Sequence, residues 1–388
     1  AYQINRKEDF QLMKVTLNRS VFMQELQTAL RAIPGKATMP ILTGVKMELT
    51  PDGIYLTGSD ADVSIETFLS KESEKAQMQI EQTGSVVIQA RFFNEIVRRL
   101  PEDTLTIELL SNQQVSITSG EANFVVAGLS ASEYPQLPEV SSATPLKLPI
   151  PLLNQVIAET VFAVSTQETR PILTGVHFIL EENQLTAVAT DSHRLSQRVI
   201  PLEEAAANFD MVIPGKSLVE LSRSLPEHEE FVEISIMDNQ VMFTTSTMKF
   251  YSRLLEGNYP DTRRLIPTNF ETSITFNGPQ FLQSVERASL LSNEGRYSII
   301  RLSITNEGVM LYGRSPELGK VEERLSYEKV EGEPLEISFN PEYMKAALRA
   351  FKDSQIVIRF LSAVRPFILE PAEDSGNFVQ LITPVRTN

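Results

Sequence analysis

The stretch RPILTGVHFILEENQLTAVATDSHRLS, residues Arg170–Ser196, decides how the rest of the chain is read. Its first half contains PILTGV, Pro171–Val176, which repeats Pro40–Val45 without a change 131 residues further along the chain. Solenoid repeats have periods of about 20–50 residues, so a repeat at this spacing is a whole domain. The second half, TDSHRL at Thr190–Leu195, is polar and unrepeated, which favours a specific role for that segment.

A third, weaker copy of the motif, RYSIIRL, begins at Arg296, 126 residues after Arg170. Each copy follows a segment whose apolar residues recur at helical spacing, and each precedes a strand, a short helix and a second strand. The helical segments begin near Val21, Leu152 and Phe281, and the strand–helix–strand segments begin at Val86, Met211 and Leu335. The fold class that we predict is therefore α+β, with three copies of one domain of about eight strands and two helices.

The expected domains are residues 13–142, 143–267 and 268–388, because segments rich in Ser, Thr and Pro separate the repeats there. Residues 1–12 read unlike the rest, whereas Met13–Leu17 reads like a natural start. We interpret residues 1–12 as an added leader outside the fold. We interpret each PILTG segment as a strand that follows the first helix of its domain.

The composition excludes several classes of protein. A chain of 388 residues with 42% hydrophobic and 22% charged residues is typical of a globular protein with several domains. No apolar run reaches the roughly 18 residues that a membrane span needs, and cysteine is absent, which excludes disulfides. The net charge of −15 argues against coating by nucleic acid through overall charge, although it allows a basic strip on one face. We expect a cytoplasmic protein.

The motifs PILTG, TDSHRL, YPDTRR at Tyr259–Arg264 and TPVR at Thr383–Arg386 lie in an order that resembles the bacterial DNA polymerase III beta subunit, the sliding clamp. The resemblance runs from Met13 to Asn388 and points to a Gram-positive source. It implies a head-to-tail homodimer that forms a six-domain ring around duplex DNA of any sequence. It also implies a processivity factor at the nucleoid that tethers the replicative polymerase catalytic subunit, the clamp loader, and other polymerases and repair proteins. No cofactor or metal is implied.

The size of one domain independently indicates that a ring around DNA needs a second chain. A domain of about 125 residues behaves as a ball roughly 36 Å wide, given a radius of gyration near 14 Å. Three such balls in a closed ring leave a hole of about 5 Å, and six leave about 35 Å. A DNA duplex is roughly 20 Å wide. Two chains can therefore encircle DNA, and one chain cannot.

The resemblance implies that the two helices of each domain line the hole, so cations on these helices are candidates for phosphate contacts. The candidates are Arg19, Arg31, Arg91, Arg98, Arg99, Lys216, Arg223, Arg287, Lys345 and Arg349, with Lys36 and Gln167 in the loops after the first helices of domains 1 and 2. Taken singly, each cation is equally compatible with an ordinary solvated helix face.

The resemblance also implies a groove between domains 2 and 3 for a partner peptide that carries Gln and apolar residues. Its residues would be Leu173, Thr190, Ser192, His193, Arg194, Leu195, Pro260, Arg264 and Leu265 of domain 2, and Asn340, Tyr343, Val364, Pro366, Leu381, Thr383, Pro384, Val385 and Arg386 of domain 3. Two places depart from the family pattern: relatives often have Gly where Ser192 stands, and some have Met-Pro-Met at Thr383–Val385.

The same resemblance places the dimer contact at Leu290 and Leu291, which would join domain 3 of one chain to domain 1 of the other. The alternative for these two residues is an ordinary core helix. A second alternative concerns the whole protein: a β-rich scaffold that docks peptides without encircling DNA. The assembly state and the charge on the inner helices separate that scaffold from a clamp.

A catalytic role is not expected. Asp191, Ser192 and His193 have the residue types of a hydrolase triad, but a triad assembles its members from separate segments. The chain has no GxSxG elbow, no Walker A motif and no dinucleotide-binding glycine pattern. The other histidines, His177 and His228, lack the spacing of a metal site.

Overall fold

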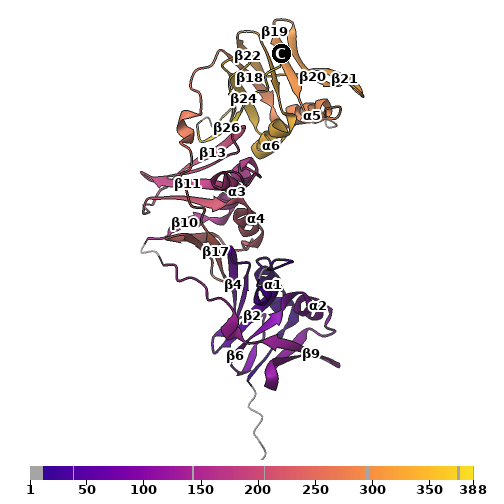
Figure 1. Ribbon diagram of the computed structural model, residues 1–388, viewed down its shortest axis with the longest axis vertical. Helices are drawn as coiled ribbons and strands as arrows, with labels where there is room; N and C mark the ends of the chain where they lie inside the picture. The colour runs from indigo at the N-terminus through magenta and orange to yellow at the C-terminus, as the bar shows by residue number, and fades with distance from the viewer. Residues whose placement is uncertain are drawn as a thin grey trace, which may run out of the picture. The chain divides into compact units, whose positions relative to one another are not determined.

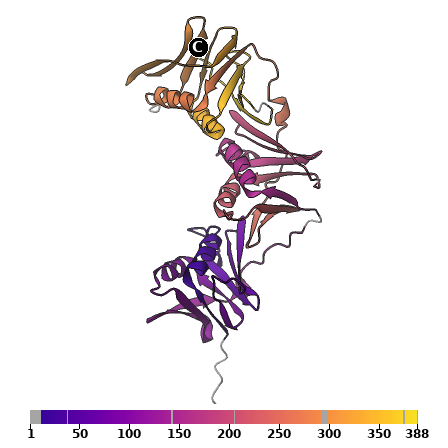
Figure 2. The same ribbon diagram turned by 180° about the vertical axis from the view of Figure 1, so that it is seen from behind.

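The computed structural model of the chain describes residues 12–37, 39–141, 144–204, 206–292, 298–373 and 376–387. Residues 1–11 of the expected leader, the boundary residues 142 and 143, and the first two residues of the third motif copy lie outside the described residues. The chain forms two compact units, residues 1–150 with 220–253 and residues 151–219 with 254–388. Figure 1 and Figure 2 show the chain from opposite sides.

The described residues contain three repeats of similar element order. Repeat 1 has β1 (Met13–Asn18), α1 (Arg19–Leu30), β2 (Gly44–Thr50), β3 (Gly53–Ser59), β4 (Val63–Ser70), β5 (Gln79–Gln82), β6 (Gly84–Gln89), α2 (Ala90–Arg99), β7 (Thr104–Leu109), β8 (Gln114–Ser119) and β9 (Ala122–Leu129). Repeat 2 has β10 (Leu146–Pro149), α3 (Ile150–Thr160), β11 (Gly175–Glu181), β12 (Gln184–Thr190), β13 (Arg194–Pro201), β14 (Phe209–Pro214), α4 (Gly215–Ser224), β15 (Phe231–Met237), β16 (Gln240–Thr244) and β17 (Met248–Arg253).

Repeat 3 has β18 (Thr272–Asn277), α5 (Gly278–Ser289), β19 (Ile300–Thr305), β20 (Gly308–Ser315), β21 (Gly319–Arg324), β22 (Lys329–Gly332), β23 (Leu335–Phe339), α6 (Pro341–Phe351), β24 (Gln355–Phe360), β25 (Phe367–Pro371) and β26 (Phe378–Ile382). Each repeat thus has two helices and eight or nine strands among the described residues, as the sequence predicted. The predicted strand–helix–strand segments are β6–α2–β7, β14–α4–β15 and β23–α6–β24.

Three of the helices begin at an asparagine that ends a strand or directly follows one. The side chains of Asn18, Asn277 and Asn340 accept hydrogen bonds from backbone N–H groups in the first turns of α1, α5 and α6. Such a cap stabilises a helix by about 1 kcal/mol, because it satisfies a donor that has no partner within the helix. The sequence therefore sets the point where each strand turns into a helix.

The identical PILTG segments are not strands. Pro40–Thr43 and Pro171–Thr174 form short 3-10 turns, and the strands β2 and β11 begin only at the glycines that follow. Proline suits the first position of such a turn, where its missing N–H has no acceptor to lose. The hydroxyl of Thr43 donates to the Pro40 carbonyl at 2.7 Å, which holds the turn.

The glycine of the motif is required by packing. A Cβ atom at Gly44 would lie 2.5 Å from the Val87 side chain, and one at Gly175 would lie 2.6 Å from the Ile213 carbonyl oxygen. Both distances are shorter than any ordinary contact, so neighbouring strands could not approach a larger residue as closely. The need for a turn and then a close approach explains why PILTG is kept without a change in both repeats.

Buried apolar side chains fill the space between the helices and the sheets. In repeat 1, Phe22 and Leu26 of α1 pack with Phe93 and Val97 of α2, and all four are fully buried. Both views show α1 and α2 side by side on the strands of this repeat. Repeat 3 has an equivalent core, with α5 packed against α6.

Strands of neighbouring repeats join edge to edge. In the 13-stranded sheet, β17 of repeat 2 pairs with β4 of repeat 1, from Met248 opposite Thr67 to Ser252 opposite Val63. In the nine-stranded sheet, β26 of repeat 3 pairs with β13 of repeat 2, from Arg194 opposite Ile382 to Arg198 opposite Phe378. Each junction uses five residue pairs, so backbone hydrogen bonds run from one repeat into the next.

Among the strands that keep an unpaired side within the described part of the chain, β21 and β9 hold matching places in the repeat pattern; β5, β10, β14, β22 and β23 also end their sheets. The strand β21 is the outer strand of the four-stranded sheet in repeat 3. The strand β9 pairs with β6 only at Gly128 and Leu129, which leaves residues 122–127 paired with β8 alone. Such edges present free N–H and C=O groups that can pair with another strand.

Candidate docking turn and DNA-facing cations

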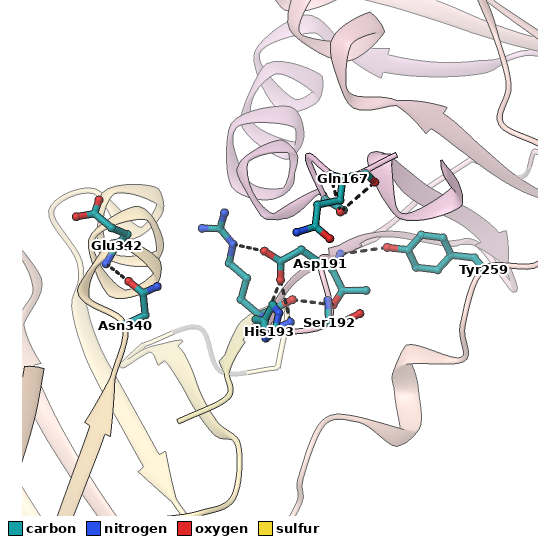
Figure 3. Close-up of polar contacts among 10 residues, drawn as sticks. Gln167, Asp191, Ser192, His193, Tyr259, Asn340 and Glu342 are labelled. Carbon is teal, nitrogen blue, oxygen red and sulfur yellow. Dashed lines mark hydrogen bonds and ion pairs between the residues drawn. The ribbon is translucent and has the colours of Figure 1, made fainter. Parts of the chain in front are cut away.

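The TDSHRL segment forms the tight turn between β12 and β13, and its own side chains hold it. The Asp191 carboxylate accepts hydrogen bonds from the backbone N–H groups of His193 and Arg194 at 2.9 and 3.0 Å. The Thr190 hydroxyl accepts from the Ser192 N–H and donates to the Arg194 carbonyl. Figure 3 shows these contacts, which leave the side chains of Ser192 and His193 exposed.

Ser192 departs from the family pattern at a place where the backbone favours glycine. Its φ is +79°, in the left-handed region that side chains other than glycine rarely adopt. In return, the serine hydroxyl accepts a hydrogen bond from Arg170 at 3.3 Å. That bond links the turn to the loop of Gln167, whose side chain points toward the turn in Figure 3.

Arg194 and His193 bring the turn into contact with α6 of repeat 3. The Arg194 guanidinium lies over the Tyr343 ring at 4.7 Å, and the His193 ring stacks with the same ring at 6.3 Å. Burial and the nearby Asp191 carboxylate raise the pKa of the Tyr343 hydroxyl, against the opposing effect of Arg194. The Thr383 N–H donates to the His193 carbonyl at 2.9 Å, so the C-terminal segment also reaches the turn.

The predicted groove residues fall into three groups by exposure. The buried members are Leu173, Thr190, Leu195, Leu381 and Pro384; the half-buried ones are Arg194, Pro260, Asn340, Tyr343, Pro366, Thr383 and Val385; the exposed ones are Ser192, His193, Arg264, Leu265, Val364 and Arg386. Leu265 and Val364 are 50% and 48% exposed, which is unusual for apolar side chains of this size. Leu173, by contrast, is 2% exposed and is a core residue, and Asn340 uses its side-chain oxygen to cap α6.

The predicted DNA-facing cations differ in how they are partnered. Arg98 and Arg99 pair with Glu95, Arg223 with Glu220, Arg287 with Glu323, and Arg349 with Glu286. Arg19 donates to the backbone carbonyls of Glu102 and Arg98. The exposed cations for which no ion pair is found within the described residues are Arg31, Lys36, Arg91 and Lys216. Gln167 is exposed as well.

The position of Lys345 differs from the sequence-based expectation that this residue faces DNA. Its side chain is 10% exposed, and its ammonium group lies 2.7 Å from the Glu342 carboxylate and 3.3 Å from the Ser289 hydroxyl. The lysine therefore links α6 to α5 inside repeat 3. A phosphate could not reach it without displacing these contacts, because buried charges are held by their partners.

The predicted interface residues are partly exposed, and a second set of apolar residues was missed. Leu290 caps the end of α5 and is 69% exposed. Repeat 1 exposes Phe92 of α2 and three residues of β9, namely Phe124, Val125 and Leu129. The sequence held a signal for them: NFVV in β9 is apolar on both faces of the strand, whereas a strand with one solvated face alternates.

The triad alternative finds no support in the turn. The Asp191 carboxylate is occupied by backbone N–H groups and by Arg194. No hydrogen bond joins Ser192 to His193 within the described part of the chain, and no group of described residues has the make-up of a metal site.

Among the described residues, no helix is both long enough and apolar enough to cross a membrane.

Three α+β repeats joined edge to edge, with the TDSHRL turn at one junction, define the class of DNA clamp proteins. Profiles of the DNA polymerase III beta subunit match the chain three times: the N-terminal domain at residues 13–138, the central domain at 147–261 and the C-terminal domain at 263–386. The beta sliding clamps of Streptococcus pneumoniae TIGR4 and Bacillus subtilis 168 are each 46% identical over 378 residues, covering 97% of this chain and 100% of theirs.

A crystal structure of the DNA polymerase III beta chain from Streptococcus pneumoniae TIGR4 superposes with a TM-score of 0.95 at 46% identity, over 97% of this chain and 100% of that one. The chain therefore belongs to the DNA polymerase III beta subunit family, the bacterial beta sliding clamps. It is a DNA sliding clamp, a processivity factor of DNA replication. The relatives named here come from Gram-positive bacteria, in agreement with the sequence-based expectation.

Proposed function

We propose that two copies of this chain close a six-domain ring by pairing β21 of one copy with β9 of the other, head to tail. The observation that carries this proposal is the equivalence of the two junctions inside the chain. Residues 63–67 of β4 and 194–198 of β13 face the neighbouring repeat, and the two segments are 131 positions apart, as the PILTGV motifs are. The same five positions of the repeat are used twice.

The order of strands in each repeat indicates which strands would form the third junction, between two copies of the chain. The strands β4 and β13 are the third strands after the first helix of their repeats, and β21 holds that place in repeat 3. The strands β17 and β26 end their repeats, and β9 ends repeat 1. Both β21 and β9 have an unpaired side among the described residues, so a second copy supplies what each lacks.

Exposed apolar residues support this pairing. Leu290 and Leu291 follow α5, which packs on β20 and β21 in repeat 3. Phe92, Phe124, Val125 and Leu129 are exposed in repeat 1. Burying them against each other would contribute roughly 25 cal/mol for each Å² of apolar surface removed from water.

The hole of this ring attracts DNA by charge alone. Arg31, Lys36, Arg91 and Lys216 are the main contacts that we propose, because they are exposed and make no ion pair within the described residues. The paired arginines, Arg19, Arg98, Arg99, Arg223, Arg287 and Arg349, contribute less, since phosphates must compete with their carboxylate or carbonyl partners. Lys345 is left out of this proposal, and Gln167 is kept as a polar contact. Loose contacts of this kind leave the clamp able to slide.

The groove lies beside the TDSHRL turn at residues 190–195, which we call the docking turn. This groove receives the tethering peptides. Leu265 and Val364 offer exposed apolar surface, and Pro260, Tyr343 and Pro366 add half-buried surface beside it. We assign this groove to peptides of the replicative polymerase catalytic subunit, the clamp loader, and other polymerases and repair proteins. The clamp acts at the nucleoid without a catalytic site of its own, and its domains span residues 13–142, 143–267 and 268–388.

The ring is tested by molar mass. Light scattering after gel filtration, at micromolar concentration, is expected to give about 87 kDa, twice the 43.5 kDa of the chain. A value of 43.5 kDa at every concentration would refute the ring and favour the peptide-docking scaffold. Binding to duplex DNA should weaken steeply with salt and show no sequence preference.

The groove is tested with Val364→Asp, because Val364 is exposed and its replacement spares the core. A labelled peptide carrying one Gln and two Leu should lose at least about tenfold in affinity, since a carboxylate would be desolvated at the contact. Tyr327→Asp, at a residue that is 46% exposed, is the matched control and should bind as the unmodified protein does. Equal affinity in both variants would refute the groove. Leu173→Asp is not a clean test, because Leu173 is buried.

A further inference from the structure

A cavity of about 430 Å³ lies on the sheet in repeat 2, next to the segment that carries Arg264 and Leu265. Successive residues of a strand point to opposite faces. On β11, Phe178 and Leu180 are buried on one face, while His177, Ile179 and Glu181 line the cavity on the other. The cavity therefore lies on the opposite face of the sheet from Phe178 and Leu180, and no residue of the TDSHRL turn is part of its lining.

The register of four strands builds the floor of this cavity. Ile179 lies opposite Asp210 of β14 on one side and Thr186 of β12 on the other, and Val199 of β13 lies opposite Thr186. The next row along holds His177, Val188 and Gln197 in the same way. Three aliphatic side chains, Ile179, Val188 and Val199, thus alternate with polar groups across the floor.

The wall of the cavity is the segment from Tyr259 to Arg263. The Tyr259 ring lies 4.6 Å from the His177 ring, and its hydroxyl oxygen accepts the Thr190 N–H at 3.1 Å, as Figure 3 shows. Thr262 is buried at 5% exposure, and Asp261 caps the short 3-10 turn that follows it. The wall is therefore held at both ends, and it leads directly into the residues that we assign to the groove.

The polar groups of the cavity are mainly hydrogen-bond acceptors. Its lining includes the carboxylates of Glu181, Glu182, Asp210 and Asp261. Arg263 is the one Lys or Arg among the lining residues, and its guanidinium already lies 3.3 Å from Asp261. Three carboxylates thus have no Lys or Arg in the lining to balance them.

His177 is a buried partner of one of these carboxylates. The residue is 7% exposed, its Nε2 lies 2.6 Å from the Asp210 carboxylate, and its Nδ1 has no hydrogen-bond partner within the described residues. Because the Nδ1 atom is itself buried, the acceptors that remain open to a ligand are the carboxylates of the lining, and these favour a ligand that donates hydrogen bonds.

We propose that the cavity receives an arginine side chain from a partner, at a position that flanks the peptide in the groove. The aliphatic stem of arginine would cover Ile179 and Val199, as such stems cover apolar surface elsewhere. The guanidinium offers five donors to the carboxylates and can stack on the Tyr259 ring. This inference rests on the proposed groove, because the wall segment joins the two sites.

The experiment uses two peptides with the same groove sequence of one Gln and two Leu. Each is extended by a Gly-Ser linker, at either end in turn, that finishes in two arginines or in two citrullines of the same shape without charge. The arginine peptide is expected to bind the protein about fivefold more tightly than the citrulline peptide, the most that partly exposed ion pairs usually give. No difference at either end would overturn the proposal.

Matched variants separate the cavity from the overall negative charge. In Glu181→Gln/Asp210→Asn the arginine advantage should fall below about twofold, whereas Glu307→Gln/Glu317→Gln, two exposed carboxylates of repeat 3, should keep it. An equal loss in both double variants would overturn the cavity. The unextended peptide should bind all three proteins alike.

A second measurement keeps the cavity testable if the groove proposal fails. The Ile179 δ1 methyl signal, assigned with Ile179→Val, reports on the cavity floor in the intact protein. Millimolar N-acetylarginine amide should shift this signal, and N-acetylcitrulline amide should not. An unmoved signal would refute arginine binding whether or not the groove peptide binds.

Discussion

The junction of β13 with β26 and the edges of β9 and β21 use the same places in the repeat, yet they look different. All five residues of β26 are buried. In β9, five of the eight residues are exposed, and in β21 four of the six are exposed. The exposure of a strand is therefore set by whether the chain itself provides its neighbour. The comparison explains why β9 has exposed apolar residues although it ends its repeat as β26 does.

The junction of β13 with β26, here called the inner junction, also differs in its polar contacts from the unpaired edges of β9 and β21. At the inner junction the Glu159 carboxylate is 4% exposed and binds Arg198 of β13 at 2.7 Å, while the Arg198 guanidinium lies over the Phe378 ring of β26. Burial raises the pKa of Glu159, although Arg198 opposes this shift. Beside the free edge of β21, the pair of Arg287 and Glu323 is 53% and 27% exposed. A buried pair depends far more on both of its members.

Breaking the inner junction is expected to have the largest effect. Arg198→Ala leaves the Glu159 carboxylate buried without its cation, which should lower the free energy of unfolding by about 3–5 kcal/mol. Arg287→Ala is the control and should cost less than about 1 kcal/mol, because its pair is exposed. Urea denaturation followed by tyrosine fluorescence, at one protein concentration, measures both. Equal losses would show that the two places do not differ in this way.

Breaking the proposed outer junction should affect assembly and leave the fold intact. Val125 is 51% exposed on β9, so Val125→Asp should be tolerated within the chain but would bury a charge between copies. We expect the dissociation constant of the dimer to rise about 100-fold, measured by light scattering across a dilution series. Met237→Asp, at the exposed end of β15, should leave it unchanged. A dimer that persists equally in both variants would argue against the β9 edge.

The smallest effect is expected for a substitution on α1, which packs on β4 next to the junction with β17, and this effect depends on pH. Burial and the Glu229 carboxylate raise the pKa of Glu25 on α1 to about 7 from 4.5. Below about pH 4.5 the Glu25 carboxyl is protonated in both the folded and the unfolded chain, and the fold keeps its full stability. As the pH rises through 7, the carboxyl must ionise inside the folded protein, and the free energy of unfolding falls. Glu25→Gln should therefore stabilise the protein at pH 8 and change little at pH 4.

The expected gain at pH 8 is about 1–2 kcal/mol, reduced from the full value of the shift because Glu25 is only partly buried. Thermal unfolding at pH 4, 6 and 8 measures it. The Glu48→Gln variant, at an exposed residue of β2, is the control for the loss of one negative charge. A gain of the same size at pH 4 and pH 8 would assign the effect to packing and rule out ionisation.

The sequence allowed the repeat structure to be predicted because that structure depends on local patterns. Helical spacing placed α1, α3 and α5, and asparagine caps fix where several helices begin. Side-chain surroundings depend on contacts between distant segments, which no local pattern reveals. Lys345 was expected at the DNA surface, but α5 supplies a hydroxyl that holds it inside. Leu173 was expected in the groove wall, but it lies in the core.

The strand pairing between repeats carries a consequence for symmetry. A surface that joins a strand of one kind to a strand of another kind can be propagated without limit, because every added copy again offers one free edge. A ring of six domains closes only if each junction turns the chain by about 60°, and any other angle leads to an open spiral. The five residue pairs at each junction therefore set whether the assembly ends at two chains or grows into a filament.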